Sequence, residues 1–339
     1  MPALTAIDQV GVKKDIKDLV YNVDQKGTPL IAMIQKNPKL TNLLFQWQVD
    51  SFDPVDLDTH LDGKDLADSD FGSNMNRVML SGRLQQRVKG FRVSPAAQDV
   101  SEVAGVKDEF GLSIQKAIAN FKRSLEAGFL SDLDSVQGTS SNADRTRGLG
   151  SWISNSQQSD LPVPSDYLTP ASSIYSGKKS EFTQQSLQDL LTSIWNVRGV
   201  KTDFILMCGS TLKTMISDFA NHVPNAPTGL TTVKSFNQNS ADRKIIDIIE
   251  IFEGNFGNLE IIANPFIGYN GNGDDAEEFN RLHRGYIFHP DDIHMRTRGQ
   301  PEFVKNEDKG GGKRGFIRDF TGLEIRNPQS LAKIAPTDA

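Results

Sequence analysis

The chain has 339 residues, of which 24% are charged and 37% belong to the apolar set, and its formal net charge is -6. Such a composition is typical of a folded protein with a sizeable core and excludes a disordered or fibrous chain, while the acidic balance argues against a protein that grips a nucleic-acid backbone. No apolar run is long enough to cross a bilayer and the first residues lack the apolar core of an export signal, so we expect synthesis in the cytoplasm and no membrane partner.

The first 95 residues predict an arm followed by a two-stranded excursion. Residues 1–45 contain few residues that could form a core of their own. A short amphipathic stretch at 13–23 is followed by a Gly-Thr-Pro turn. Residues 44–52 alternate like a strand with Phe45, Trp47 and Val49 on one face, and a second strand-like run returns at 76–94. Between them, seven aspartates in residues 53–70 predict a solvated loop. An isolated pair of strands is marginal in water, so this excursion needs a partner surface.

Residues 107–130 predict one long helix of five or six turns, near 30 Å in length. Its apolar positions recur every three or four residues, and its charged positions lie off that stripe. The stripe comprises Phe110, Ile114, Ala117, Ile118, Phe121, Leu125 and Phe129, and the charged set comprises Lys116, Lys122, Arg123 and Glu126. We interpret the stripe as core. Residues 131–182 then read as a long loop region, in which Arg145 and Arg147 lie among glycines that lack phosphate-loop spacing.

The rest of the chain predicts a mixed α+β region. Residues 183–199 have the pattern of an amphipathic helix that ends at Gly199, 203–209 of a strand, and 210–219 of a helix capped by Ser210. A strand pair is expected across the turn at 254–258, and the segments after residue 284 are strand-like with turns between them. This order of elements favours the α+β class.

Two histidines and two aspartates lie close together in the stretch YIFHPDDIHMRTR: His289, Asp291, Asp292 and His294. In a continuous strand His289 and His294 would face opposite sides, and Pro290 favours a turn. The pattern also resembles the zinc motif of a deacetylase family, but no histidine follows His294, so we predict no metal here. The hydrolase built on these residues remains an alternative.

Other candidates for chemistry are equally incomplete. The acidic loop matches an EF-hand at Asp58, Asp62 and Gly63, but His60 stands at the third position and Ser69 replaces the bidentate glutamate at the twelfth, so we interpret the loop as a solvated acidic tip. The single cysteine, Cys208, cannot form an internal disulfide and follows a strand-like run, so we interpret it as a buried apolar residue, with a catalytic thiol at a helix start as the alternative. We expect no cofactor and no enzyme.

Several collinear segments resemble the major capsid proteins of tailed bacteriophages with the Hong Kong 97 fold. They are DIKDLVYNVDQKGTPLIAMI and FQWQVD near the start, VSEVAGVKDEFGLSIQKAIANFKRSLEAGFL in the long helix, RTRGLGSWISN in the loop, then LQDLLTSIW, DFILMCGSTLKTMISDF and, at the end, FTGLEIRNPQSLAKI. No one of them is a signature, and the resemblance rests on their order over nearly the whole chain.

The resemblance implies an assignment for each region. Residues 1–45 would be the N-terminal arm, 46–97 the extended loop that lies over a neighbouring subunit, and 98–135 the spine helix of a peripheral domain. Residues 136–179 would be a long loop region, 180–270 the axial domain, and 271–339 the late strands that complete the sheet. Expected assembly contacts are Phe45, Trp47, Asp62, Lys64, Arg145, Arg147 and Trp152.

The same resemblance implies the partners and the location. The chain would assemble with itself into hexamers and pentamers of an icosahedral head shell that encloses double-stranded DNA without reading its sequence. A separate scaffolding protein, a portal and a decoration protein are possible further partners, and the shell would form in the host cytoplasm and become part of the virion. An encapsulin-like compartment, which shares the fold and encloses protein, is the alternative shell.

Overall fold

A computed structural model describes residues 27–36, 40–52, 55, 57, 62–65, 76–99, 108–219 and 249–337. The amphipathic stretch at 13–23 lies outside these residues, as do Asp58, His60 and Ser69 of the EF-hand comparison. No helix in the described ranges is both long enough and apolar enough to span a bilayer.

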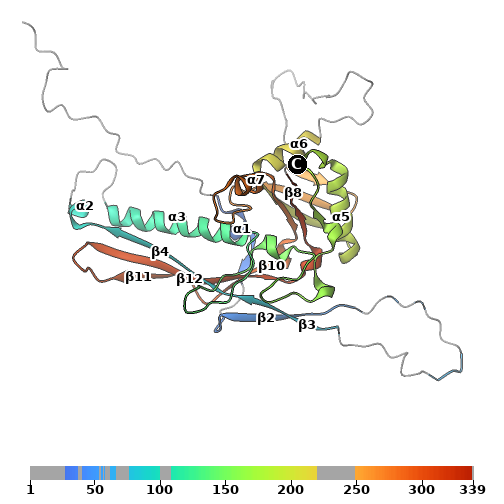
Figure 1. Ribbon diagram of the computed structural model, residues 1–339, viewed down its shortest axis with the longest axis horizontal. Helices are drawn as coiled ribbons and strands as arrows, with labels where there is room; N and C mark the ends of the chain where they lie inside the picture. Colours follow the sequence, from blue (N-terminus) through green and yellow to red (C-terminus); the bar gives the residue numbers. More distant parts are fainter. Residues whose placement is uncertain are drawn as a thin grey trace, which may run out of the picture.

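The long helix α3 runs from Glu109 to Phe129 and lies along a sheet (Figure 1). Asp108 caps its first turn, because the Asp108 carboxylate accepts a hydrogen bond from the N–H of Phe110. Beside α3, the described residues form a five-stranded sheet in which β10, β11 and β4 all pair antiparallel with the long strand β12. Its strands are β1 (Gln35–Lys36), β4 (Gln85–Val93), β10 (Ile293–Thr297), β11 (Glu302–Asn306) and β12 (Lys313–Ile325).

A second, six-stranded sheet in the described part of the chain carries three further helices. Its order is β5-β13-β9-β6-β8-β7, with β6 and β8 parallel and β9 antiparallel to β6. The strands are β5 (Ile174–Tyr175), β6 (Thr202–Cys208), β7 (Ile251–Glu253), β8 (Gly257–Ala263), β9 (Gly285–Phe288) and β13 (Ala332–Ile334). The helices are α5 (Gln184–Arg198), α6 (Ser210–Asp218) and α7 (Asp275–His283), and Figure 1 shows them grouped around this sheet.

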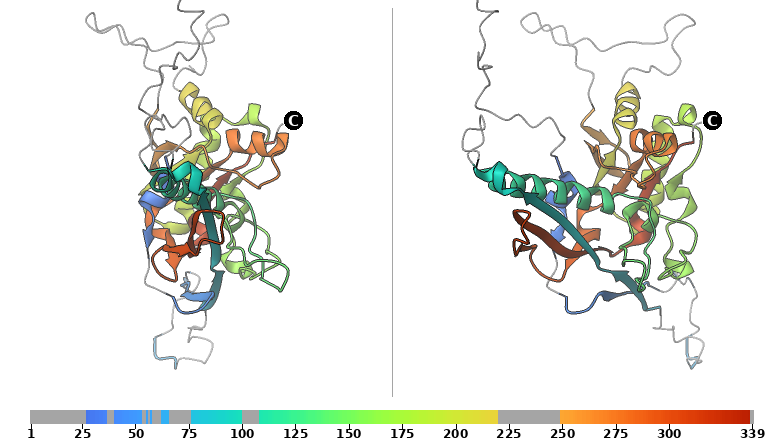
Figure 2. Two further views of the ribbon diagram at one scale, coloured as in Figure 1. Left: turned by 90° about the vertical axis from the view of Figure 1, so that its left-hand side faces the viewer. Right: turned by 60° about the vertical axis from the view of Figure 1, so that its left-hand side comes forward.

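The excursion is a hairpin of β2 (Leu44–Val49) and β3 (Val78–Arg83). Phe45 and Trp47 are buried on one face of β2, as the alternation predicts. The returning run at 76–94 differs from the single strand expected, because it divides at the fully buried Leu84. The first half, β3, pairs with β2, whereas the second half, β4, pairs with β12 in the larger sheet. Both halves of the returning run therefore find partners within the same chain, and the second half joins the larger sheet (Figure 2).

The helix ends agree with the sequence in one case and differ in another. In α5 the side chain of Thr183 accepts from the N–H of Ser186, and Gly199 ends the helix at φ 71°, a conformation that favours glycine. In α6, by contrast, Gly209 is the N-terminal cap and no side chain caps the helix, so the expected Ser210 cap is wrong. The shorter helices are α1 (Pro29–Met33), α2 (Pro95–Asp99) and α4 (Leu149–Trp152).

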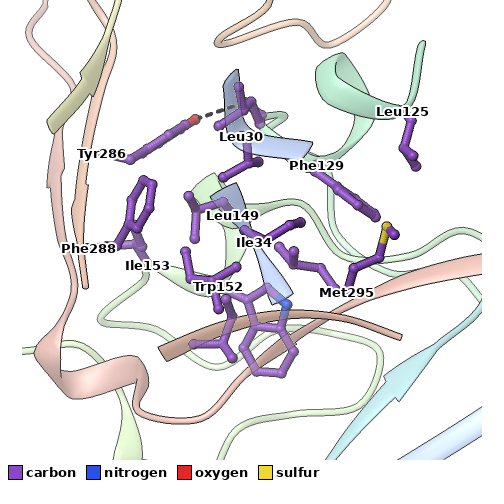
Figure 3. Close-up of a cluster of buried hydrophobic side chains, with 14 of the residues drawn as sticks. Leu30, Ile34, Leu125, Phe129, Leu149, Trp152, Ile153, Tyr286, Phe288 and Met295 are labelled. Atoms are coloured by element: carbon purple, nitrogen blue, oxygen red, sulfur yellow. Dashed lines mark hydrogen bonds between the residues drawn. The ribbon is translucent and has the colours of Figure 1, made fainter. Parts of the chain in front are cut away.

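Two clusters of buried side chains hold these layers together. One lies among the six-stranded sheet, α5 and α6, with Leu187, Phe204 and Leu259 in its centre. The other joins α1, α3, α4, both sheets and the hairpin, and Figure 3 shows Trp152, Phe129 and Leu30 converging in it from different segments. Because the second cluster draws on segments far apart in the sequence, it fixes the hairpin and α3 relative to the body of the molecule.

Candidate assembly surfaces

The base of the β2–β3 hairpin is anchored by two tryptophans. The indole Nε1–H of Trp47 donates to the carbonyl oxygen of Ile325 at 3.1 Å, and its ring lies 5.6 Å from that of Phe45 and 5.7 Å from that of Trp152. Trp152, at the end of α4, is 1% exposed. These rings therefore hold the hairpin base within its own chain.

Arg147 organises the loop between α3 and α4. Its guanidinium is almost fully buried, stacks 4.6 Å from the ring of Trp152 and pairs with the Asp134 carboxylate at 2.8 Å. It also donates to the carbonyl oxygens of Asp160 and Leu161. Arg145, which is half-buried, donates through Nε to the carbonyl of Asp134 at 2.8 Å. The two arginines thus close the loop on itself through carboxylate and carbonyl acceptors.

The described residues near the hairpin tip are exposed. Asp62 and Lys64 are accessible to solvent, and Phe52, Val55 and Leu57 are 102%, 91% and 88% exposed. Three large apolar side chains so close together on a water-exposed segment are typical of a surface that another molecule covers.

Glu126, in the last turn of α3, joins three segments of the chain. Its carboxylate accepts the N–H of Leu30 at 2.8 Å, the N–H of Ile31 at 3.0 Å and the amide Nδ2–H of Asn264 at 2.7 Å. Burial raises the pKa of Glu126, and the backbone and Asn264 donors oppose that rise. The expectation that Glu126 lies off the buried stripe is wrong, because the side chain is 0% exposed, whereas Ile118 of the stripe is 42% exposed.

Asp132, just after α3, pairs with Lys333 of β13 and with Arg284, which precedes β9. Lys333 Nζ lies 2.6 Å and Arg284 Nη2 2.7 Å from its two carboxylate oxygens, and the Tyr286 hydroxyl donates to it at 3.1 Å. Burial alone would raise the pKa of Asp132, but the two cations outweigh it and lower the pKa below its usual range. This cluster connects the end of α3 to β9 and β13.

The stretch with His289 forms a turn, as predicted. Residues Pro290–Asp292 make one 3₁₀ turn, and His289 Nδ1 accepts the N–H of Asp291 at 3.3 Å. Asp292 is engaged by Arg198 at 2.5 Å and by the hydroxyl of Ser330 at 2.9 Å, and His294 Nε2 contacts the carbonyl of Asp291. Among the described residues, no group of three or more potential metal ligands comes together.

Cys208 packs as the apolar residue that the sequence favours. It is fully buried at the end of β6, and burial raises the pKa of its thiol to about 12. Burial therefore disfavours the thiolate that a nucleophile at the start of α6 would need.

The structure divides the expected assembly contacts into two groups. Phe45, Trp47, Arg147 and Trp152 are buried together in their own chain, whereas Asp62, Lys64 and, in part, Arg145 reach the surface. No local sequence pattern points to Glu126 or Asp132. In the sequence, both carboxylates look like ordinary solvent-exposed charges. No pattern along the chain reveals that Asn264 contacts Glu126 or that Arg284 and Lys333 contact Asp132.

Two comparisons with known proteins find matches that cover nearly the whole chain. The model of a family described as SU10 major capsid protein matches residues 3–338. Among solved structures, the capsid of the cyanophage P-SCSP1u is similar at 9% identity and a TM-score of 0.59, over 99% of this chain and 96% of that chain. The capsid of the native GTA particle matches at 9% identity and a TM-score of 0.60, over 97% of this chain and 96% of that chain. The mature capsid of bacteriophage PhiM1 matches at 11% identity and a TM-score of 0.59, over 99% of this chain and 95% of that chain. No curated protein matches the sequence.

Proposed function

The chain belongs to the SU10 major capsid protein family, and on this premise we propose that hexamers and pentamers of it close into an icosahedral shell around double-stranded DNA. It is a head shell protein of a tailed phage with the α+β Hong Kong 97-like fold, and it is part of the capsid of the virion. The observation that carries the proposal is the family match over residues 3–338. We propose that its role is structural, without a catalytic step.

Each region of the chain would have its own role in assembly. Residues 1–45 would act as the N-terminal arm, 46–97 as the extended loop, 98–135 as the spine helix, 136–179 as a loop region, 180–270 as the axial domain and 271–339 as the late strands. The exposed apolar side chains at Phe52, Val55 and Leu57 support the role of the extended loop, since they offer surface that a neighbouring subunit can bury. Many moderate contacts of this kind sum to a stable closed shell.

Other partners follow from the same proposal. A separate scaffolding protein would guide assembly in the host cytoplasm, and a portal and a decoration protein would join the shell. The net charge of -6 supports contact with DNA that is weak and independent of sequence, because an acidic subunit does not grip the phosphate backbone.

Density-gradient sedimentation of the full chain, expressed alone and with candidate scaffolding proteins, tests the proposal. We expect fast-sedimenting particles that contain the chain as their main protein. A chain that stays at the top of every gradient as a monomer contradicts the proposal. Stoichiometric zinc in the purified chain would favour the hydrolase alternative, and particles filled with protein would favour the compartment.

A further inference from the structure

The loop between β8 and α7 contains both Asn-Gly dipeptides of the sequence. They are Asn270-Gly271 and Asn272-Gly273, and they follow one another directly. The loop leads into α7 (Figure 1), and both glycines have positive φ values, 86° for Gly271 and 67° for Gly273. Beyond the adjacent residues, no heavy atom lies within 4 Å of the place that a β-carbon would take at either glycine. The loop is therefore open around both dipeptides.

An asparagine that precedes a glycine can react with its own backbone. The glycine nitrogen loses its proton and attacks the side-chain carbon Cγ of the asparagine, so that a new N–C bond forms. The bond from Cγ to Nδ2 breaks, and Nδ2 leaves as ammonia after it takes up a proton. Water then opens the five-membered imide and leaves aspartate or isoaspartate, so the sum consumes one water and releases one ammonia. Glycine favours the attack because it has no β-carbon in the way and reaches many backbone conformations.

Glu277, in the first turn of α7, holds the second of the two dipeptides. Its side chain is 3% exposed, and its Oε2 accepts the N–H of Asn272 and the N–H of Gly273, each at 2.8 Å. The N–H of Glu277 donates in turn to Asp274 Oδ1 at 2.8 Å, which fixes the start of α7. A carboxylate that accepts an N–H opposes loss of its proton, because the deprotonated nitrogen would face a negative charge. Glu277 therefore suppresses the reaction at Asn272.

The first dipeptide lacks this restraint. Among the residues that the structure describes, no acceptor meets the N–H of Gly271, and the Oδ1 of Asn270 is buried without a hydrogen-bond partner. No carboxylate therefore opposes loss of the Gly271 proton. No hydrogen bond to Asn270 Oδ1 has to break before Cγ of this side chain turns toward the Gly271 nitrogen.

We propose that Asn270 is a site of spontaneous deamidation in the folded chain and that Glu277 protects the neighbouring Asn272 from the same reaction. The inference is independent of the proposed function, because it needs only the folded subunit and water. Each event replaces a neutral amide by a carboxylate next to a turn that already holds Asp274 and Glu277. The modified chain is therefore more acidic, and ion exchange separates it from the unmodified chain.

Incubation of the full-length protein in heavy-oxygen water at mildly alkaline pH tests the site. Digestion with trypsin in ordinary water then gives one peptide, residues 245–281, that contains both asparagines, and its fragment ions assign the heavy oxygen to one of them. We expect Asn270 to acquire the label about tenfold faster than Asn272, because a charge-assisted hydrogen bond holds only the Gly273 proton. An unlabelled Asn270, or equal labelling of the two residues in the folded chain, overturns the inference.

The protective role of Glu277 has its own test. Glu277→Gln keeps the size of the side chain and removes its charge, so it should raise the labelling rate of Asn272 about tenfold and leave that of Asn270 unchanged. Glu278→Gln, at the exposed neighbouring position, is the matched control and should change neither rate. A folded Glu277→Gln chain in which Asn272 reacts as slowly as in the wild type overturns the role of Glu277.

Unfolding of the wild type in urea tests the same role without a substitution. The two asparagines have the same following residue, so their labelling rates should become similar once the Glu277 carboxylate no longer meets the Gly273 N–H. A difference between Asn270 and Asn272 that persists unchanged in urea would show that the folded structure does not cause it, and it overturns the inference even if Glu277→Gln fails to fold.

Discussion

At the scale of single residues, Asp132 balances the charges of two cations that the fold buries beside it. Its carboxylate lies within 2.7 Å of both Lys333 and Arg284, whose side chains are 15% and 11% exposed. Removal of one member of a buried cluster leaves the others without compensation. The cluster therefore contributes to the stability of the contact between the end of α3 and the six-stranded sheet.

Asp132→Asn should lower the free energy of unfolding by about 3–5 kcal/mol at neutral pH, because it leaves two buried cations unpaired. Urea unfolding of the unassembled subunit measures this loss. Asp275→Asn, at an exposed position in the first turn of α7, is the control and should change stability by less than about 0.5 kcal/mol.

The same pair of proteins should differ in the pH dependence of unfolding. The pKa of Asp132 is lowered in the folded chain, so its contribution is fully present above its ordinary value of 3.8 and is lost as the pH falls through the folded pKa. The difference between wild type and Asp132→Asn should therefore shrink in acid. A difference that grows as the pH falls below 3.8 would contradict the assignment.

Residue roles were predictable from sequence where a local rule decided them. Pro290 disfavours a regular strand, and the turn at His289 follows from that rule. Glu126 is different, because helical spacing alone places a carboxylate next to Leu125 on the solvent side. Only the approach of Leu30 and Asn264 from distant parts of the chain makes its burial favourable.

At the scale of elements, α5 shows how local signals define a helix. Thr183 and Ser186 form a reciprocal capping box, and Gly199 adopts the left-handed conformation at the other end. The same logic failed for α6, where Gly209 lies against the carbonyl oxygens of Arg281 and Leu282. This close approach of the backbone sets the start of α6 without a side-chain cap. Sequence rules for helix capping do not predict such an approach between distant segments.

Two Thr→Ala changes, one at the N-cap of α5 and one inside the helix, should differ in their effect on stability. Thr183→Ala removes the cap and should destabilise the chain by about 1 kcal/mol. Thr192→Ala, in the middle of the same helix, should be neutral or stabilising by a few tenths of a kcal/mol, since alanine has the higher helix propensity. Thermal unfolding of both variants measures the contrast, and equal losses at the two positions would show that the capping box does not stabilise α5.

The returning run at 76–94 shows why pairing partners escape prediction. Its residues favour extended structure throughout, so the strand character was predictable. The change of partner at Leu84, from β2 to β12, depends on segments more than 200 residues apart.

At the scale of the whole molecule, the chain combines a packed body with a hairpin tip that exposes apolar side chains. The family was predictable through the resemblance to the capsid proteins, and the family match confirms it. The geometry of the surfaces was not predictable, because the tryptophans expected to make contacts between subunits are buried in their own chain. Aromatic residues in a strand look the same in sequence whether their own chain or a neighbour covers them.

Combined replacement of Phe52, Val55 and Leu57 by serine should prevent shell formation without destabilising the subunit. The three side chains are almost fully exposed, so the folded monomer loses little, whereas the interface loses apolar area that would be buried on assembly. Gradient sedimentation measures assembly, and urea unfolding measures the subunit. Val200→Ser, at a 56% exposed position after α5, is the control and should assemble normally.

The central claim is that many copies of this chain form a closed shell in which each hairpin tip lies on a neighbouring subunit. A cryo-electron-microscopy reconstruction of the assembled particles tests it most directly. The account predicts an icosahedral shell in which β2 and β3 extend from one subunit over the body of the next. Open aggregates, or a closed shell in which each tip folds back on its own subunit, would contradict it.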